Sequence, residues 1–127
     1  MNFNDNKAIY LQIADKLKDE IMAQKYKEEQ RIPSVREYAA MVEVNANTVM
    51  RSYELLEREG IIFNRRGIGF FVSKNATKLI LKYRKEMFYS EELAYFFSRL
   101  SSFGITPEEL SEKFSNYLKH NGNEKNI

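Results

Sequence analysis

The stretch from Ile32 to Val72 constrains the fold more than any other part of this 127-residue chain. It holds two amphipathic helical patterns separated by a short polar turn at residues 43–45. Ser34 followed by Glu37 forms a capping box, in which each side chain satisfies a backbone N–H of the other residue at the start of a helix. Asn45 is a favourable N-cap for the second helix. The sequence therefore predicts two short helices joined by a tight turn.

A β-hairpin is predicted directly after the second helix, which ends at Gly60, a residue that suits the left-handed position beyond a helix C-terminus. Residues 61–63 and 70–72 are β-branched and aromatic runs of strand length. The tip between them holds two arginines and two glycines, Arg65, Arg66, Gly67 and Gly69. Glycine permits positive φ or a close backbone approach, and the arginines place positive charge at the tip. An isolated two-stranded hairpin is marginally stable, so this one must pack against the helices.

Helix, turn, helix and a hairpin with a basic tip form the outline of a winged helix-turn-helix that binds DNA. At about 100° per residue, one side of the second helix is expected to be buried, and it holds Val49, Ser52, Tyr53 and Leu56. Near the start of that helix, the other side and its flanks present Asn47, Thr48, Met50 and Arg51. Amide, hydroxyl and guanidinium groups pair with base edges and phosphates in a major groove. Arg36, in the first turn of the preceding helix, is expected to lie close to the phosphate backbone.

Each of these groups also has a purely structural interpretation. Polar residues on an exposed helix face are usually solvated, and so are arginines at a hairpin tip. Farther along the second helix, Glu54, Glu57 and Glu59 would repel phosphates. Any DNA contact is therefore expected in the first turns of that helix.

The segments on either side are predicted to be helical. Apolar residues recur at three- and four-residue steps from Ala8 to about Ala23, as in an amphipathic scaffold helix. An aromatic-rich helical pattern runs from Thr77 to about Phe103 and stops at Gly104. Another helix opens after Thr106, its predicted cap, and the chain from His120 onward is expected to fray.

These patterns predict a mostly α fold with a small β-hairpin. We expect a winged helix-turn-helix DNA-binding domain over residues 1–74 and a C-terminal helical hairpin with a short tail over residues 75–127. Two helices in so short a segment cannot easily bury so wide an apolar surface by themselves. Self-association into a twofold homodimer is the economical solution. Packing back on the N-terminal domain of the same chain is the alternative.

Other chemistries lack the residues that they need. The chain has no cysteine, and its one histidine, His120, lies in a polar segment, so thiolate and multi-histidine metal sites and a histidine-based triad are excluded. Gly67-Ile68-Gly69 lacks the third glycine and the following helix of a dinucleotide site. We expect no enzymatic activity, no catalytic residue and no cofactor. The net charge of +2 excludes a strongly basic tail, and the polar start without a long apolar run predicts a cytoplasmic protein with no membrane segment.

The central stretch resembles the DNA-binding domain of GntR-family bacterial transcription regulators. Pro33 to Glu37 looks like their L-P-S-x-R-E element. Val44 to Val49 and Leu56 to Ile62 match their second, DNA-recognition helix and its exit. Arg66 to Val72 is similar to their wing, R-G-x-G-x-F-V, and Ile9 to Ala14 is similar to their opening I-Y-x-Q-I.

The resemblance extends to a subfamily. Asn45 to Val49 with Tyr53, together with the short C-terminal region, looks like the YtrA-type regulators. The resemblance implies a homodimer that binds a palindromic operator in double-stranded DNA. Carried over by position, the implied DNA contacts are Ser34, Arg36, Asn45, Asn47, Thr48, Arg51, Arg65, Arg66 and Gly67. Glu29, Ala46 and Met50 depart from the family pattern, and the last two stand where arginines are common, so fewer charged base contacts are expected.

The leading hypothesis is a homodimeric winged-helix transcription regulator, which we expect to be a repressor rather than an activator. One rival is a winged-helix protein-interaction module without DNA binding, for which the glutamates of the second helix are the best support. The other rival is a sensor whose aromatic C-terminal helices enclose a small-molecule effector. The sequence identifies neither the operator nor such an effector.

Overall fold

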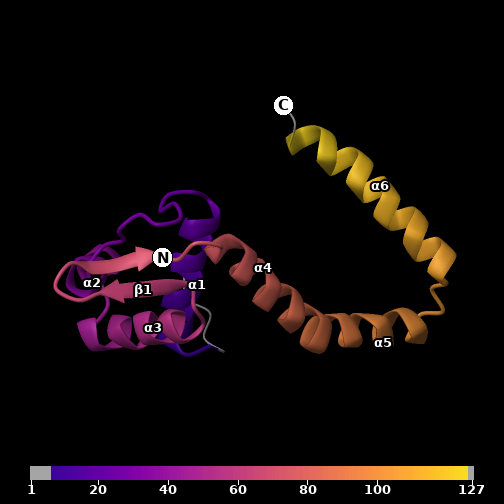
Figure 1. Cartoon of the computed structure of the whole chain (residues 1–127). Coiled ribbons are helices and arrows are strands. Elements are labelled where there is room, and N and C mark those ends of the chain that lie inside the picture. The colour runs from indigo at the N-terminus through magenta and orange to yellow at the C-terminus, as the bar shows by residue number, and fades with distance from the viewer. Residues whose placement is uncertain (1–6, 126–127) are drawn as a thin grey trace. The chain divides into compact units, whose positions relative to one another are not determined.

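The computed structural model describes residues 7–125, with side chains described up to residue 121. Its elements fall into two compact units, one ending at Arg84 and the other beginning at Lys85. The fold is mostly helical, with a two-stranded antiparallel wing after an N-terminal helix-turn-helix and further helices towards the C-terminus, as predicted (Figure 1). In chain order the elements are α1 (Ile9–Met22), α2 (Val35–Val42), α3 (Ala46–Arg58), β1 (Ile62–Arg65), β2 (Gly69–Val72), α4 (Ala76–Met87), η1 (Phe88–Leu93), α5 (Ala94–Ser102) and α6 (Pro107–Lys125).

The core of the first unit lies where α1, α2, α3 and the hairpin meet. Ile13, Leu17 and Ile21 of α1 are spaced to share one helix face, and all three are buried. The predicted buried side of α3 is confirmed, since Val49, Ser52, Tyr53 and Leu56 are all buried. Each large apolar side chain taken out of water contributes about 1.5–3 kcal/mol, so the meeting of these faces holds α3 against α1.

Caps fix the start of α2 and the turn between α2 and α3. The Glu37 N–H donates to Ser34 Oγ (3.1 Å), and the Ser34 N–H donates to Glu37 Oε1 (2.9 Å). Because this backbone donor stabilises the carboxylate, the pKa of Glu37 lies below its ordinary value. Glu43 ends α2 in the left-handed conformation, and Asn45 Oδ1 accepts the Asn47 N–H at 2.8 Å to begin α3. The predicted capping box and N-cap are therefore confirmed.

The hairpin places its two arginines in different positions. β1 and β2 pair in antiparallel fashion, and the last pair before the tip is Arg65 with Gly69. Arg65 therefore belongs to the strand, and residues 66–68 form the tip. The Ile68 N–H donates to the Arg65 carbonyl (2.9 Å), and Gly67 adopts a φ of 78°, which favours glycine. The sequence pattern placed both arginines at the tip, because it cannot tell where strand pairing stops.

The segment before α2 pairs with the hairpin along β2. The Val72 N–H donates to the Gln30 carbonyl (2.9 Å), and the Ile32 N–H donates to the Phe70 carbonyl (3.0 Å). Residues 24–31 are mostly polar and give no strand pattern, so the sequence does not predict this pairing. This pairing ties the wing to the entrance of the helix-turn-helix.

Tyr53 of α3 contacts the wing, α2 and the segment that precedes α2. Its ring meets that of Phe70 edge-on, with 5.1 Å between centroids, and lies 6.1 Å from the ring of Tyr38. Its hydroxyl donates to the Pro33 carbonyl at 2.6 Å. Burial raises the pKa of Tyr53, so the hydroxyl remains a neutral donor. One side chain thus contacts α2, the wing and the segment that precedes α2.

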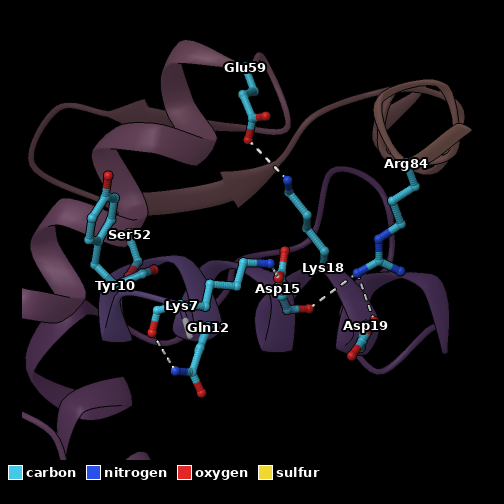
Figure 2. A network of polar contacts seen from close by, with 9 residues as sticks. All are labelled: Lys7, Tyr10, Gln12, Asp15, Lys18, Asp19, Ser52, Glu59 and Arg84. Carbon is cyan, nitrogen blue, oxygen red and sulfur yellow. Dashed lines mark hydrogen bonds and ion pairs between the residues drawn. The ribbon is translucent and has the colours of Figure 1, made fainter. Parts of the chain in front are cut away.

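The first unit continues into α4. Ala76 and Ile80 are buried in its core, so the first two turns of α4 pack with the helix-turn-helix. Arg84 then donates to the Asp19 carboxylate at 2.7 Å (Figure 2). The boundary in packing therefore follows Arg84, whereas the change in sequence pattern follows residue 74. The helical period alone does not show that α4 begins on one unit and ends in the next.

The second unit contains one element that the sequence did not predict. η1 is a π-helical stretch of six residues inside the long helix expected from 77 to 103. The predicted break is confirmed, because Gly104 adopts a φ of 68° after α5. The Glu109 N–H donates to Thr106 Oγ1 (3.2 Å), as expected for the cap of α6.

α6 is longer than the sequence suggested. It runs to Lys125, so the prediction of fraying from His120 is wrong over residues 120–125, and residues 126–127 lie outside those described. Gly122 lies inside the helix, where glycine costs about 1 kcal/mol relative to alanine without breaking the hydrogen-bond ladder. Within residues 7–125, no helix is both long enough and apolar enough to cross a membrane.

Tyr53→Phe is expected to lower the free energy of unfolding by about 1 kcal/mol, because the Pro33 carbonyl loses its donor while the ring stays packed. The shift would be measured as a lower urea midpoint with an unchanged slope. Tyr83→Phe is the matched control, since its hydroxyl donates to the Glu59 carbonyl over a long 3.4 Å. Equal losses in the two variants would show that the Tyr53 hydroxyl has no special role.

Candidate nucleic-acid interface

The first turns of α3 present the polar face that the sequence predicted. Asn47 and Arg51 are exposed, Thr48 is half-buried, and Met50 is 40% exposed beside them. Asn45 precedes them as the N-cap and uses its side-chain oxygen for the backbone. A helix N-terminus carries a partial positive charge that attracts phosphates. This end of α3 therefore combines groups that bind bases with a dipole that favours the DNA backbone.

The start of α2 is a second helix N-terminus beside this surface, and it carries Ser34 and Arg36. Arg36 is exposed in the first turn. The Ser34 oxygen accepts the Glu37 N–H, so the hydroxyl proton can still donate to an acceptor such as a phosphate oxygen. The contact of Arg36 with the phosphate backbone stays a prediction.

The wing divides its charge between strand and tip. Phe63 and Arg65 lie on the same face of β1, and the Arg65 guanidinium carbon is 5.0 Å from the ring centroid of the cross-strand Phe71. Arg66 and Gly67 are exposed at the tip. A cation above an aromatic face is held by the ring's negative quadrupole, so Arg65 is oriented while Arg66 projects from the end of the hairpin.

The arginines of this surface have no acidic partner among residues 7–121. The ion pairs described there involve other basic side chains, namely Lys7, Lys16, Lys18, Lys25 and Arg84. The arginines of this surface, none of which forms an ion pair among the described residues, are Arg36, Arg51, Arg65 and Arg66. Their positive charges are therefore available to phosphates, even though the net charge of the chain is only +2.

Glu59 is a weaker source of repulsion than the sequence suggested. Its carboxylate lies 3.2 Å from Lys18 Nζ, and both side chains are largely shielded from solvent (Figure 2). Glu54 and Glu57 remain exposed farther along α3. The acidic part of the helix is thus limited to its later turns, away from Asn47.

Two residues beside this surface could not be identified from the sequence. The Arg51 guanidinium carbon lies 4.0 Å from the ring centroid of Tyr10, which belongs to the first turn of α1. The Arg31 side chain lies against Gly69, where an added Cβ would be 2.9 Å from Arg31 Nε. Both contacts join segments that are distant in the chain, and periodicity within one segment cannot reveal them.

Comparison with known proteins gives one consistent result. A family model described as bacterial regulatory proteins, gntR family, matches residues 9–72. The chain is 36% identical over 117 residues to the HTH-type transcriptional regulator YhcF of Bacillus subtilis, covering 92% of this chain and 95% of YhcF. It is 36% identical over 104 residues to the HTH-type transcriptional repressor YtrA of the same organism, covering 82% and 79% of the two chains.

A solved structure agrees over nearly the whole chain. The crystal structure of a transcriptional regulator assigned to the GntR family from Bacteroides thetaiotaomicron superposes with a TM-score of 0.82 at 50% identity. The match covers 90% of this chain and 99% of that one.

Arg36→Ala and Arg51→Ala are each expected to weaken DNA binding by roughly 1–3 kcal/mol, because each removes a charged donor from the surface. Fluorescence anisotropy at fixed salt would measure this on a duplex selected by the wild-type protein from random sequences. Arg58→Ala is the matched control, since Arg58 is exposed in the last turn of α3. Unchanged binding in both variants, or an equal loss in the control, would contradict this choice of surface.

Proposed function

The chain belongs to the gntR family of bacterial regulatory proteins and is a DNA-binding transcriptional regulator, and from that premise we propose that it represses transcription by binding a palindromic operator as a homodimer. The proposed DNA contacts are Ser34, Arg36, Asn45, Asn47, Thr48, Arg51, Arg65, Arg66 and Gly67. Residues 1–74 are the proposed DNA-binding domain, and residues 75–127 are the proposed dimerisation region.

The observation that carries the homodimer is the exposed apolar surface of the second unit. No side chain described in η1 or α5 is buried. Ten large apolar or aromatic side chains from Met87 onward are each at least 44% exposed, namely Met87, Phe88, Tyr89, Tyr95, Phe96, Phe97, Phe103, Phe114, Tyr117 and Leu118. Monomeric proteins rarely leave so much apolar surface in water. A second copy of the chain is the proposed occupant, since a twofold dimer covers the same surface on both partners at once.

The repressor role is supported by the description of a relative. YtrA of Bacillus subtilis is described as a transcriptional repressor and aligns with most of this chain. A dimer that occupies an operator next to a promoter would exclude other proteins from that DNA. A metabolite effector would act by changing the affinity for the operator, and thermal-shift screening would detect one through the higher melting temperature of its complex.

The protein-interaction alternative has less support in the structure than in the sequence. Its argument rested on three glutamates of α3, and Glu59 is paired with Lys18. Glu54 and Glu57 alone leave the first turns of the helix free of negative charge. DNA therefore remains the partner that this face of α3 fits best.

Replacing Tyr95 and Phe103 together by lysine is expected to weaken the dimer. These side chains are 67% and 65% exposed in the single chain, so the change leaves the monomer fold intact while removing apolar contacts twice per dimer. At about 1.5–3 kcal/mol for each buried aromatic, the dimer dissociation constant should rise by at least about tenfold.

Analytical ultracentrifugation would measure the mass against two 15.0 kDa chains. Met22→Lys is the control, because Met22 is a partly exposed apolar residue at the end of α1. A wild-type protein that sediments as one chain at micromolar concentration would refute the homodimer.

Selection of binding sites from random duplexes is expected to yield two inverted half-sites. Their centres should lie about 34 Å, or one helical turn, apart or a multiple of it, because each α3 would enter a major groove on one face of the DNA. A single asymmetric site bound by one chain would contradict the palindromic operator while leaving DNA binding intact.

A further inference from the structure

The closest cation–ring contact among the described residues lies at the edge of the DNA-binding surface. The Arg51 guanidinium carbon is 4.0 Å from the Tyr10 ring centroid, whereas the other arginine–ring distances run from 5.0 to 5.9 Å. At 4.0 Å the guanidinium lies over the ring, in van der Waals contact with it. Arg51 is exposed and Tyr10 is half-buried.

The backbone beside both residues is fixed by a buried hydrogen bond. The Ser52 hydroxyl donates to the Tyr10 carbonyl at 2.6 Å, and Ser52 is fully buried (Figure 2). Ser52 directly follows Arg51, so this bond fixes the first turn of α1 against the middle of α3. The buried packing of Ile13 against α3 continues the same contact into the core. The stack is therefore held at the backbone of each partner.

A stacked guanidinium keeps the groups that bind DNA. The guanidinium carries five N–H donors, and one ring face can occupy only some of them. No carboxylate among residues 7–121 pairs with it. A free arginine must give up much of its rotamer freedom when it binds, and a side chain already held by a ring gives up less.

We propose that Tyr10 is a positioning residue that holds the Arg51 guanidinium ready for DNA, so that scaffold helix α1 helps to set the strength of a contact made by α3. The proposal rests on the proposed role of Arg51 at the DNA surface. Tyr10 acts through Arg51 and touches no DNA itself. An aromatic face is the property that matters, and the tyrosine hydroxyl is dispensable.

The test is a double-mutant cycle on operator binding by the full chain. Tyr10→Phe keeps the ring, Tyr10→Leu keeps an apolar side chain without a ring, and each is combined with Arg51→Ala. A solvent-exposed cation–ring contact is worth a factor of about two to five in affinity, so Tyr10→Leu should weaken binding by that factor. Tyr10→Phe should bind like the wild type, and Tyr10→Leu should have no further effect once Arg51 is alanine.

The outcomes separate this inference from the proposed function. If the wild-type protein binds no duplex, the proposed function fails. If the wild type binds and Arg51→Ala weakens binding, but Tyr10→Leu does not, the positioning role is refuted. It is equally refuted if Tyr10→Leu strengthens binding, or if its loss persists in the Arg51→Ala background, which would indicate a general structural role.

Thermal unfolding of every variant guards against a folding defect. If Tyr10→Leu melts well below the wild type, the cycle is repeated with Tyr10→Met, which fills a similar volume without an aromatic face. The inference is supported if Tyr10→Met weakens DNA binding while Arg51 is present and has no effect once Arg51 is alanine. It is overturned if Tyr10→Met binds DNA like the wild type.

Discussion

The buried side of α3 is the constraint on which the rest of the structure depends. Tyr53 contacts Tyr38 of α2 and Phe70 of the wing, and its hydroxyl donates to the Pro33 carbonyl. The Ser52 hydroxyl likewise donates to the carbonyl of Tyr10, in the first turn of α1. Because these contacts take up one side of α3, packing and buried hydrogen bonds together set its orientation within the first unit. The opposite side is left to solvent, and its polar side chains are displayed on a rigid support.

The net charge of +2 does not show where the positive charges of this chain lie. Their positions along the elements decide which surface can attract phosphates. Lys7, Lys16 and Lys18 are paired with carboxylates in ion pairs that involve α1. Arg36 at the start of α2, Arg51 in α3 and the two arginines of the wing form no ion pair within the described residues. A surface can therefore attract phosphates while the whole protein remains nearly neutral, because screening limits each charge to its own neighbourhood of about 10 Å.

The features predicted correctly from the sequence are those determined by local chemistry. The capping box at Ser34, the N-cap at Asn45 and the buried side of α3 follow from residues within a few positions of one another. The features that were missed depend on distant partners or on small differences in energy. The stack of Arg51 on Tyr10 needs two helices to meet, and the π-helical η1 differs from an α-helix by a change in hydrogen-bond spacing that no residue pattern specifies.

The proposed DNA surface is small, and the aromatic surface of the second unit is exposed in the single chain. With Ala46 and Met50 near the start of α3, the proposed surface offers few charged groups to bases, so one domain alone is expected to bind weakly. Joining two domains makes the second binding event intramolecular and can raise affinity by 10²–10⁴ without any new DNA contact, provided that both can engage at once. Covering the aromatic side chains of α5 and α6 by a second copy would supply that connection and remove their cost in water. In the proposed dimer, one association would therefore raise the affinity for DNA and remove apolar surface from water. This gives a physical reason for η1, α5 and α6 to carry so many exposed apolar residues.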